Sequence, residues 1–262
     1  MGWAAARSHR PSPSRPLLAD PTDTGWLQPS PRWHPDAMTV TVRVPAKVNL
    51  GLRSGGRDES GYHPLSTVFH AVSIYDEVTA AWCEDGSENS RESSAIEAST
   101  GISIEVTGDY AHLVPQDRSN LAVRAVELLA KETGTQYGIA LRIHKEIPVA
   151  GGMAGGSADA AAALVAADAL WGTGLNQTRL LELAGAIGSD VPFALVGCTA
   201  IGTGRGHLVT PVPARGEYHW VFATQAQGLS TPDVFAVFDE LNPNAGGQPE
   251  SDQQLLRALR LG

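Results

Sequence analysis

Alternating apolar and polar residues predict several β-strands. The alternation is clear over residues 39–44 and resumes over 48–52, after Pro45. Side chains two positions apart on a strand share one face. We therefore expect Lys47 and Asn49 to lie side by side on the polar face of this segment. Further apolar or alternating runs predict strands at residues 65–78, 102–106, 139–145, 193–201 and 220–223.

Helices are predicted between these strands from apolar residues at helical spacing and from capping residues. Asn120 and Gly134 have the positions of an N-cap and a C-terminal glycine around a predicted helix over residues 120–132. Thr178 and Gly188 bracket a second candidate in the same way. That second helix covers residues 178–187, and two further helices are predicted over residues 158–170 and 255–261.

Two segments lie outside this regular pattern. Residues 1–37 hold seven of the seventeen prolines and show no apolar periodicity, which is typical of a disordered extension. Met38 stands directly before the first strand, so Met1 and Met38 are both candidate start sites. Residues 84–100 are polar and low in complexity, and we expect them to form a flexible insertion between two strands.

A glycine-rich stretch, Pro148–Asp159, joins a predicted strand to a predicted helix. In such a junction the free N–H groups of a helix N-terminus point at a ligand and favour an anion. Glycines let the backbone approach a phosphate closely, and Ser157 and Asp159 suit a cap and a first helical turn. The alternative is a flexible Gly/Ala linker. The tight placement between two regular elements favours a phosphate site.

Composition and charge narrow the classes of function. The 262 residues are 42% hydrophobic, enough for a sizeable core, and no apolar run is long enough to span a membrane. The net charge of −9 argues against general nucleic-acid binding. Cys83 and Cys198 match no metal or redox spacing, so we expect a cytoplasmic protein. The sequence does not indicate an oligomeric state.

Four motifs in order identify the chain as resembling the GHMP kinase superfamily, and within it the kinases that act on a cytidyl-bearing methylerythritol. They are Pro45-Ala-Lys-Val-Asn-Leu50, Gly61-Tyr-His63, Ile147-Pro-Val-Ala-Gly-Gly-Met-Ala-Gly-Gly-Ser157 and Gly188-Ser-Asp-Val-Pro-Phe193. The resemblance implies an α+β fold of two domains with the active site between them. These would be a ribosomal protein S5 domain 2-like N-terminal domain and a ferredoxin-like C-terminal domain.

The resemblance also implies residue roles. Asp190 would be the catalytic base, and Lys47 would lie beside it and the transferring phosphoryl group. Asn49, Tyr62, His63 and Phe235 would contact the substrate, with the aromatic rings and the imidazole around its cytosine. The implied ATP-binding residues are Lys145, Pro148, Val149, Ala150, Gly151, Gly152, Met153, Ala154, Gly155, Gly156, Ser157 and Ala158. ATP brings Mg²⁺, for which the sequence shows no strong carboxylate ligand.

Each of these residues has a plainer interpretation when taken singly. An aspartate before Val-Pro is commonly a turn or cap residue, and a lone strand lysine usually faces solvent. Tyr62 and His63 alone would be unremarkable loop residues. Only their combination with the glycine-rich stretch raises Lys47 and Asp190 above these alternatives.

The resemblance sets an expected domain organisation. Residues 38–210 would form the ATP-binding domain and residues 211–262 part of the C-terminal domain. GHMP kinases carry a third loop of Gly-Ser-Gly-Pro-Thr type, which nothing after Gly206 matches. We therefore expect an incomplete C-terminal domain and a truncated chain.

The implied reaction is ATP-dependent phosphorylation of the 2-hydroxyl of 4-diphosphocytidyl-2-C-methyl-D-erythritol, in the non-mevalonate route to isoprenoids. Gly61-Tyr-His63 favours this substrate over mevalonate-type, homoserine or sugar substrates, which have no cytosine to hold. One alternative is another GHMP small-molecule kinase. The other is a nucleotide-binding remnant without turnover.

Removal of residues 1–37 tests the predicted extension. We expect a chain that begins at Met38 to keep the melting temperature and the kinase activity of the full chain, because the extension contributes no periodic apolar residues to a core. Thermal unfolding and an ATP-dependent kinase assay on both chains measure this. Collapse of activity in the shorter chain would refute the prediction.

Overall fold

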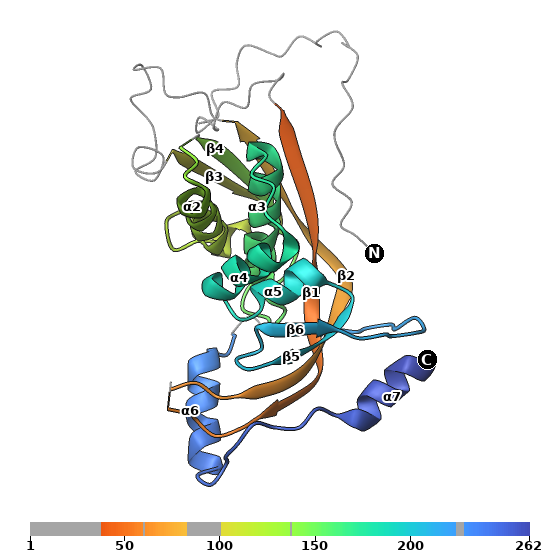
Figure 1. Cartoon of the computed structure of the whole chain (residues 1–262). Helices are drawn as coiled ribbons and strands as arrows, with labels where there is room; N and C mark the ends of the chain where they lie inside the picture. The colour runs from red at the N-terminus through yellow and green to blue at the C-terminus, as the bar shows by residue number, and fades with distance from the viewer. Residues whose placement is uncertain (1–37, 60, 83–100, 137, 224–227) are drawn as a thin grey trace, which may run out of the picture.

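Two long antiparallel strands run the length of the molecule in this computed structural model (Figure 1), which describes residues 38–59, 61–82, 101–136, 138–223 and 228–262. They are β1 (Thr39–Ser54) and β2 (Leu65–Trp82), paired along almost their whole length. The register of β1 shifts between Pro45 and Ala46 because proline has no N–H to give to the ladder. The predicted disordered extension (residues 1–37) and the predicted flexible insertion (residues 84–100) lie outside the described residues.

The other strands extend the sheet from the free edge of β2. The C-terminal half of β2 pairs with β4 (Ile139–His144), and its N-terminal half pairs with β5 (Thr199–Thr203). Beyond these lie β3 (Ile102–Thr107), parallel to β4, and β6 (Leu208–Pro211), antiparallel to β5. A single mixed sheet therefore carries both halves of the molecule.

Four helices cover one face of the upper half of this sheet (Figure 1). The central one, α3 (Gly155–Trp171), is alanine-rich and buries most of its residues, as expected for a helix packed on all sides. Around it lie α2 (Leu121–Thr133), α4 (Gln177–Ile187) and α5 (Val191–Val196). The main hydrophobic core fills the space between these helices and the sheet.

The C-terminal elements lie at the lower half of the molecule (Figure 1). Helix α7 (Gln253–Leu261) packs Leu256 and Leu259 against Val68 of β2. Helix α6 (Thr231–Leu241) has no buried residue. The predicted strand at 220–223 is wrong, because this segment pairs with no other strand in the described chain. The segment alternates like a strand, but among the described residues no neighbouring strand pairs with it.

The structure corrects three predicted boundaries. The apolar run 193–201 is divided into the end of α5 and strand β5, because Gly197 and Cys198 turn the chain with positive φ angles. Helix α3 begins at Gly155, three residues earlier than predicted, so its first residues belong to the glycine-rich stretch. Helix α4 is capped by Asn176 and not by Thr178.

Alanine substitutions at Asn176 and Thr178 test which residue caps α4. The Asn176 side chain accepts a hydrogen bond from the backbone N–H of Arg179 at 2.9 Å, whereas Thr178 is exposed. We expect Asn176→Ala to lower the free energy of unfolding by about 1 kcal/mol. Thr178→Ala, the matched control, is expected to change it by less than about 0.5 kcal/mol. Urea denaturation measures both, and equal effects would contradict the assignment.

Candidate active site

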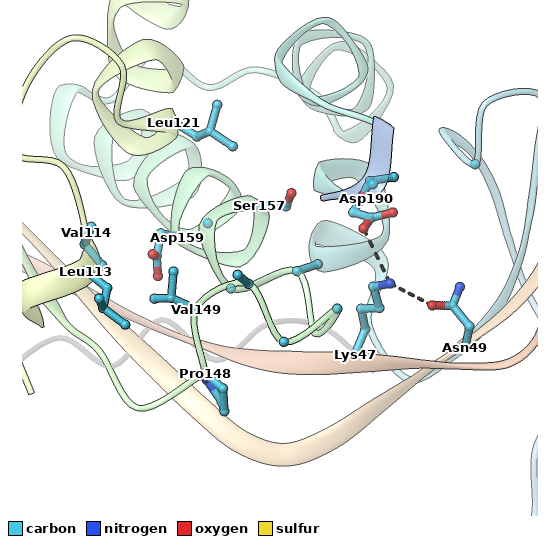
Figure 2. A pocket seen from close by; sticks show the side chains of 18 of the residues that line it. Lys47, Asn49, Leu113, Val114, Leu121, Pro148, Val149, Ser157, Asp159 and Asp190 are labelled. Atoms are coloured by element: carbon cyan, nitrogen blue, oxygen red, sulfur yellow. Dashed lines mark hydrogen bonds and ion pairs between the residues drawn. The ribbon is translucent and has the colours of Figure 1, made fainter. Parts of the chain in front are cut away.

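A cleft of about 570 Å³ opens between the glycine-rich stretch, β1 and the start of α2. This volume is in the range of small-molecule sites. Lys47, Asn49 and Asp190 lie at one side of the loop and Leu113 and Val114 at the other (Figure 2). Almost every residue predicted to bind ATP lines the cleft, namely Lys145, Pro148, Val149, Ala150, Gly151, Gly152, Ala154, Gly155, Gly156 and Ser157.

The glycine-rich stretch forms a loop over residues 148–154 and continues directly into α3. The backbone adopts positive φ at Ala150, Gly152 and Ala154, so the chain turns sharply before the helix begins. Ala154 is the N-cap and offers no side-chain acceptor. The first N–H groups of α3 therefore remain available to an anion. Ser157 lies within the helix and is not its cap, contrary to the prediction.

Lys47 and Asp190 meet at the mouth of the loop (Figure 2). The Lys47 Nζ atom lies 3.5 Å from Asp190 Oδ2, which comes from the residue before α5. Lys47 is largely buried, while a third of the Asp190 side chain is exposed to the cleft. The backbone N–H of Lys47 also donates to Met153 O at 3.2 Å. This bond ties the loop to β1, so the phosphate loop and the Lys47–Asp190 pair keep a defined separation.

A chain of hydrogen bonds orients the polar face of β1. Lys47 Nζ donates to Asn49 Oδ1 at 2.7 Å, which confirms that these two side chains are neighbours. Asn49 Nδ2 donates to Thr67 Oγ1 at 2.7 Å, and Thr67 Oγ1 donates to Gly51 O at 2.9 Å. Thr67 is buried and lines the cleft, and sequence analysis missed it. Only the β1–β2 register brings it beside Asn49, so no local pattern could have indicated it.

The other end of the cleft is apolar. Leu113 ends the short 3₁₀ helix η1 (Ala111–Leu113), and Val114, Leu121 and Val149 line the same end (Figure 2). Of these residues the sequence analysis singled out only Val149, because aliphatic side chains such as Leu113, Val114 and Leu121 carry no pattern that marks a ligand site. Together with the loop they form a site with an apolar wall beside an anion-binding backbone.

Lys145 lies beneath the loop, where two carboxylates hold it. Its Nζ atom lies 2.5 Å from Asp76 Oδ2 and 2.8 Å from Asp159 Oδ2, and all three residues are buried. The ammonium group is thus committed to protein partners. Asp159 is not the first-turn residue that the sequence indicated, because α3 begins at Gly155 and places Asp159 in the second turn, where it is buried.

Desolvation raises the pKa of the Asp159 carboxyl from 3.8 to about 8, outweighing the attraction of Lys145, and the Asp76 carboxylate adds to the rise. The Oδ1 atom of Asp159 is buried and makes no hydrogen bond. A buried carboxylate without a full set of partners is costly, so protonation relieves it.

The three residues expected around a cytosine do not form a sandwich. His63 is buried, and its ring stacks on Phe235 of α6 with centroids 4.6 Å apart. Its Nδ1 atom lies 2.9 Å from Gly55 O, and Nε2 lies 3.3 Å from Asp239 Oδ1. Tyr62 is half exposed. Phe235 therefore occupies the face of His63, and only Phe235 of the three lines the cleft among the described residues.

Two kinds of feature are absent from the described part of the chain. No group of three or more His, Cys, Asp or Glu side chains there has the geometry to hold a metal ion. None of the helices in the same residues is long and apolar enough to cross a membrane.

Comparisons with a family model, with curated proteins and with solved structures all point to kinases of the same superfamily. The GHMP kinases N terminal domain matches residues 120–198, which include the loop, α3 and Asp190. The chain is 52% identical over 225 residues to 4-diphosphocytidyl-2-C-methyl-D-erythritol kinase of Thermobifida fusca (strain YX), covering 86% of this chain and 70% of that protein. It is 50% identical to the Streptomyces coelicolor protein of the same name, covering 86% of this chain and 71% of that protein.

A solved structure shares the fold. The crystal structure of a 4-(cytidine 5'-diphospho)-2C-methyl-D-erythritol kinase superposes with a TM-score of 0.51 and 32% identity, over 67% of this chain and 56% of that one. The fold and the cleft define a small-molecule kinase with the GHMP architecture, which confirms the predicted α+β class. Within that class the chain belongs to the 4-diphosphocytidyl-2-C-methyl-D-erythritol kinase family.

The raised pKa of Asp159 predicts how stability changes with pH. The folded chain keeps the proton up to about pH 8, whereas the unfolded chain releases it near pH 4. The contribution of this group to the free energy of unfolding therefore falls as pH rises from about 4 to about 8. Asp159→Asn cannot titrate and is expected to lack this fall. Urea denaturation between pH 5 and 8.5 measures both proteins, and parallel curves would contradict the assignment.

Proposed function

We propose that the chain transfers the γ-phosphoryl group of ATP to the 2-hydroxyl of 4-diphosphocytidyl-2-C-methyl-D-erythritol. The observation that carries this proposal is the Lys47–Asp190 pair, 3.5 Å apart, at the mouth of a phosphate loop. The substrate is taken from the names of the relatives that are about half identical to this chain.

The proposed reaction needs little covalent chemistry from the protein. The substrate oxygen forms a bond to the γ-phosphorus, and the bond between that phosphorus and the bridging oxygen to the β-phosphate breaks. Asp190 accepts the hydroxyl proton. Its carboxylate is open to the cleft, as a general base must be. Proton transfer to such a base typically accelerates a reaction by about 10²–10⁴-fold. Positioning and charge stabilisation supply the remainder, as is usual for phosphoryl transfer.

Lys47 would act on both partners of this step. Its ammonium group holds the Asp190 carboxylate in place and brings positive charge near the phosphoryl group as charge shifts onto the β-phosphate. Asn49 and Thr67 keep the ammonium oriented through their hydrogen bonds. The N–H groups at the start of α3 would hold the other phosphates.

The two ends of the cleft would receive the two bases. The aliphatic wall of Leu113, Val114 and Leu121 suits the flat face of adenine beside the loop. Phe235 lies at the opposite end, near His63 and Tyr62, where the cytosine would bind. Phe235 stacks on His63 with one face and lines the cleft, so its other face would be offered to the cytosine.

ATP enters such reactions with Mg²⁺, which neutralises phosphate charge. Mg²⁺ usually keeps several waters and takes few protein ligands, so the phosphates themselves would provide most of its binding. The hydroxyl of Ser157, on the cleft side of α3, is the protein group that fits this role. A cytoplasmic location and the absence of nucleic-acid partners remain predictions from composition.

An activity assay separates the proposal from its alternatives. Purified protein is incubated with ATP, Mg²⁺ and 4-diphosphocytidyl-2-C-methyl-D-erythritol, and ADP and the 2-phosphate product are measured. We expect equal amounts of both. ADP formation only with homoserine, mevalonate or a sugar would favour another GHMP kinase. A higher melting temperature with ATP but no product from any substrate would favour a nucleotide-binding remnant.

Asp190→Asn tests the proposed base. We expect kcat to fall by about 10²–10⁴-fold, because the amide cannot accept the hydroxyl proton. The KM for ATP should change little, since the phosphate loop is left intact. Glu105→Gln on β3 removes a carboxylate that pairs with Arg142 outside the cleft, and it serves as the control with wild-type kcat. Near-normal turnover of Asp190→Asn would remove this residue from the mechanism.

A further inference from the structure

A buried cluster of three charged residues joins the sheet to both ends of the phosphate loop. Asp76 lies on β2, Lys145 directly follows β4, and Asp159 lies in the second turn of α3. Each is almost completely buried. Lys145, predicted to lie at the ATP site, lines the cleft, but its Nζ atom lies between the two carboxyl groups.

Asp76 fastens the chain just before the loop. Its Oδ1 atom accepts hydrogen bonds from the backbone N–H groups of Glu146 and Ile147, at 2.7 and 2.8 Å. Its Oδ2 atom accepts from Lys145 Nζ at 2.5 Å. One carboxylate thus sets the direction in which three consecutive residues leave β4.

Lys145 connects the end of β4, before the loop, to helix α3, after the loop. Its ammonium donates to Asp159 Oδ2 of α3 at 2.8 Å. It also lies against the first residue of the helix, since a Cβ atom at Gly155 would approach Nζ to 2.7 Å. The absence of a side chain at Gly155 therefore allows the ammonium to sit beneath the helix N-terminus.

The loop between these two attachment points has a costly backbone conformation. Ala150 and Ala154 have φ angles of 58° and 57°, a region that L-residues other than glycine adopt at a cost of about 1–2 kcal/mol each. Such residues persist where their surroundings determine them strongly. Attachments at both ends of the loop provide that constraint.

We infer that Asp76, Lys145 and Asp159 are positioning residues that hold the phosphate loop and the start of α3 in the conformation that binds the phosphoryl donor. This inference rests on the proposed function of the loop as the ATP site. The residues act through the backbone N–H groups and touch no reacting atom.

The cluster holds one acidic group more than its single ammonium can pair. Two carboxyl groups share that ammonium, so Asp159 stays protonated up to about pH 8, and its Oδ1 atom has no hydrogen-bond partner. The raised pKa of Asp159 has the same origin, the desolvation of its carboxyl. Buried ionic groups are often no more stable than apolar replacements. Asp159 is therefore expected to contribute to ATP binding without adding to the stability of the fold.

Three variants on α3 separate positioning from stability. Asp159→Ala removes the bond from Lys145 to the helix and leaves the Lys145–Asp76 pair intact. Asp159→Asn keeps an oxygen that can accept from Lys145. Asp168→Ala is the matched control at the other end of the helix, where Asp168 accepts from Leu175 N at 3.1 Å and from the Thr173 hydroxyl.

The experiment measures the melting temperature, kcat, and the KM for ATP and for the cytidyl substrate. We expect Asp159→Ala to raise the KM for ATP about tenfold, equivalent to about 1.4 kcal/mol, with no fall in melting temperature. The KM for the cytidyl substrate should be unchanged, and Asp159→Asn should restore most of the loss. Asp168→Ala should lower the melting temperature and leave both KM values unchanged. Amide hydrogen exchange over residues 149–157 should be faster in Asp159→Ala alone.

The outcomes distinguish this inference from the proposed function. A wild-type KM for ATP in Asp159→Ala, or an equal rise in Asp168→Ala, would overturn the positioning role. If the wild-type chain makes no product, the proposed function fails, and the dissociation constant of ATP measured by calorimetry replaces the KM values. A tenfold weaker constant in Asp159→Ala then supports the inference. Absence of ATP binding to the wild-type chain would overturn both.

Discussion

The close packing of α3 against the sheet is the constraint on which the site depends. Its inward faces carry alanines at positions 158, 160–163, 166 and 167, and these small side chains let the helix approach β1 and β2 closely. This approach brings Met153 O within 3.2 Å of the Lys47 backbone N–H. It also places the helix N-terminus over the Lys145 cluster. The phosphate loop and the Lys47–Asp190 pair thus share one rigid support.

The two halves of the molecule differ in how firmly they are built. The phosphate side lies on a continuous core of buried aliphatic residues from β1–β4 and α2–α5. The side expected to bind the cytidyl group includes α6, which buries no residue, and its Phe235 rests on His63. Elements with few buried contacts open at low free-energy cost. The nucleotide side is accordingly preformed, whereas α6 on the other side can shift at a lower free-energy cost.

Local sequence features predicted much of the phosphate side. Period-two alternation placed Lys47 and Asn49 together, because the side-chain direction of a strand depends only on its own backbone. The caps of α2, Asn120 and Gly134, were also correct, since a cap acts within one helical turn. The cap of α4 was missed because Asn176 and Thr178 are both suitable N-cap residues two positions apart. Helix α5 was missed because a short apolar run fits a buried strand as well as a buried helix.

The sequence by itself determined the family, the loop and the polar pair on β1, since these are signals carried by neighbouring residues. Only the tertiary structure decided the partners that come from distant strands. Thr67 reached Asn49 through the β1–β2 register. Asp76 reached Lys145 across the sheet, 69 positions apart in the chain. Burial made Asp159, predicted only as a first-turn residue, part of the support beneath the loop. Burial and strand register are properties of the whole fold, and no local pattern encodes them.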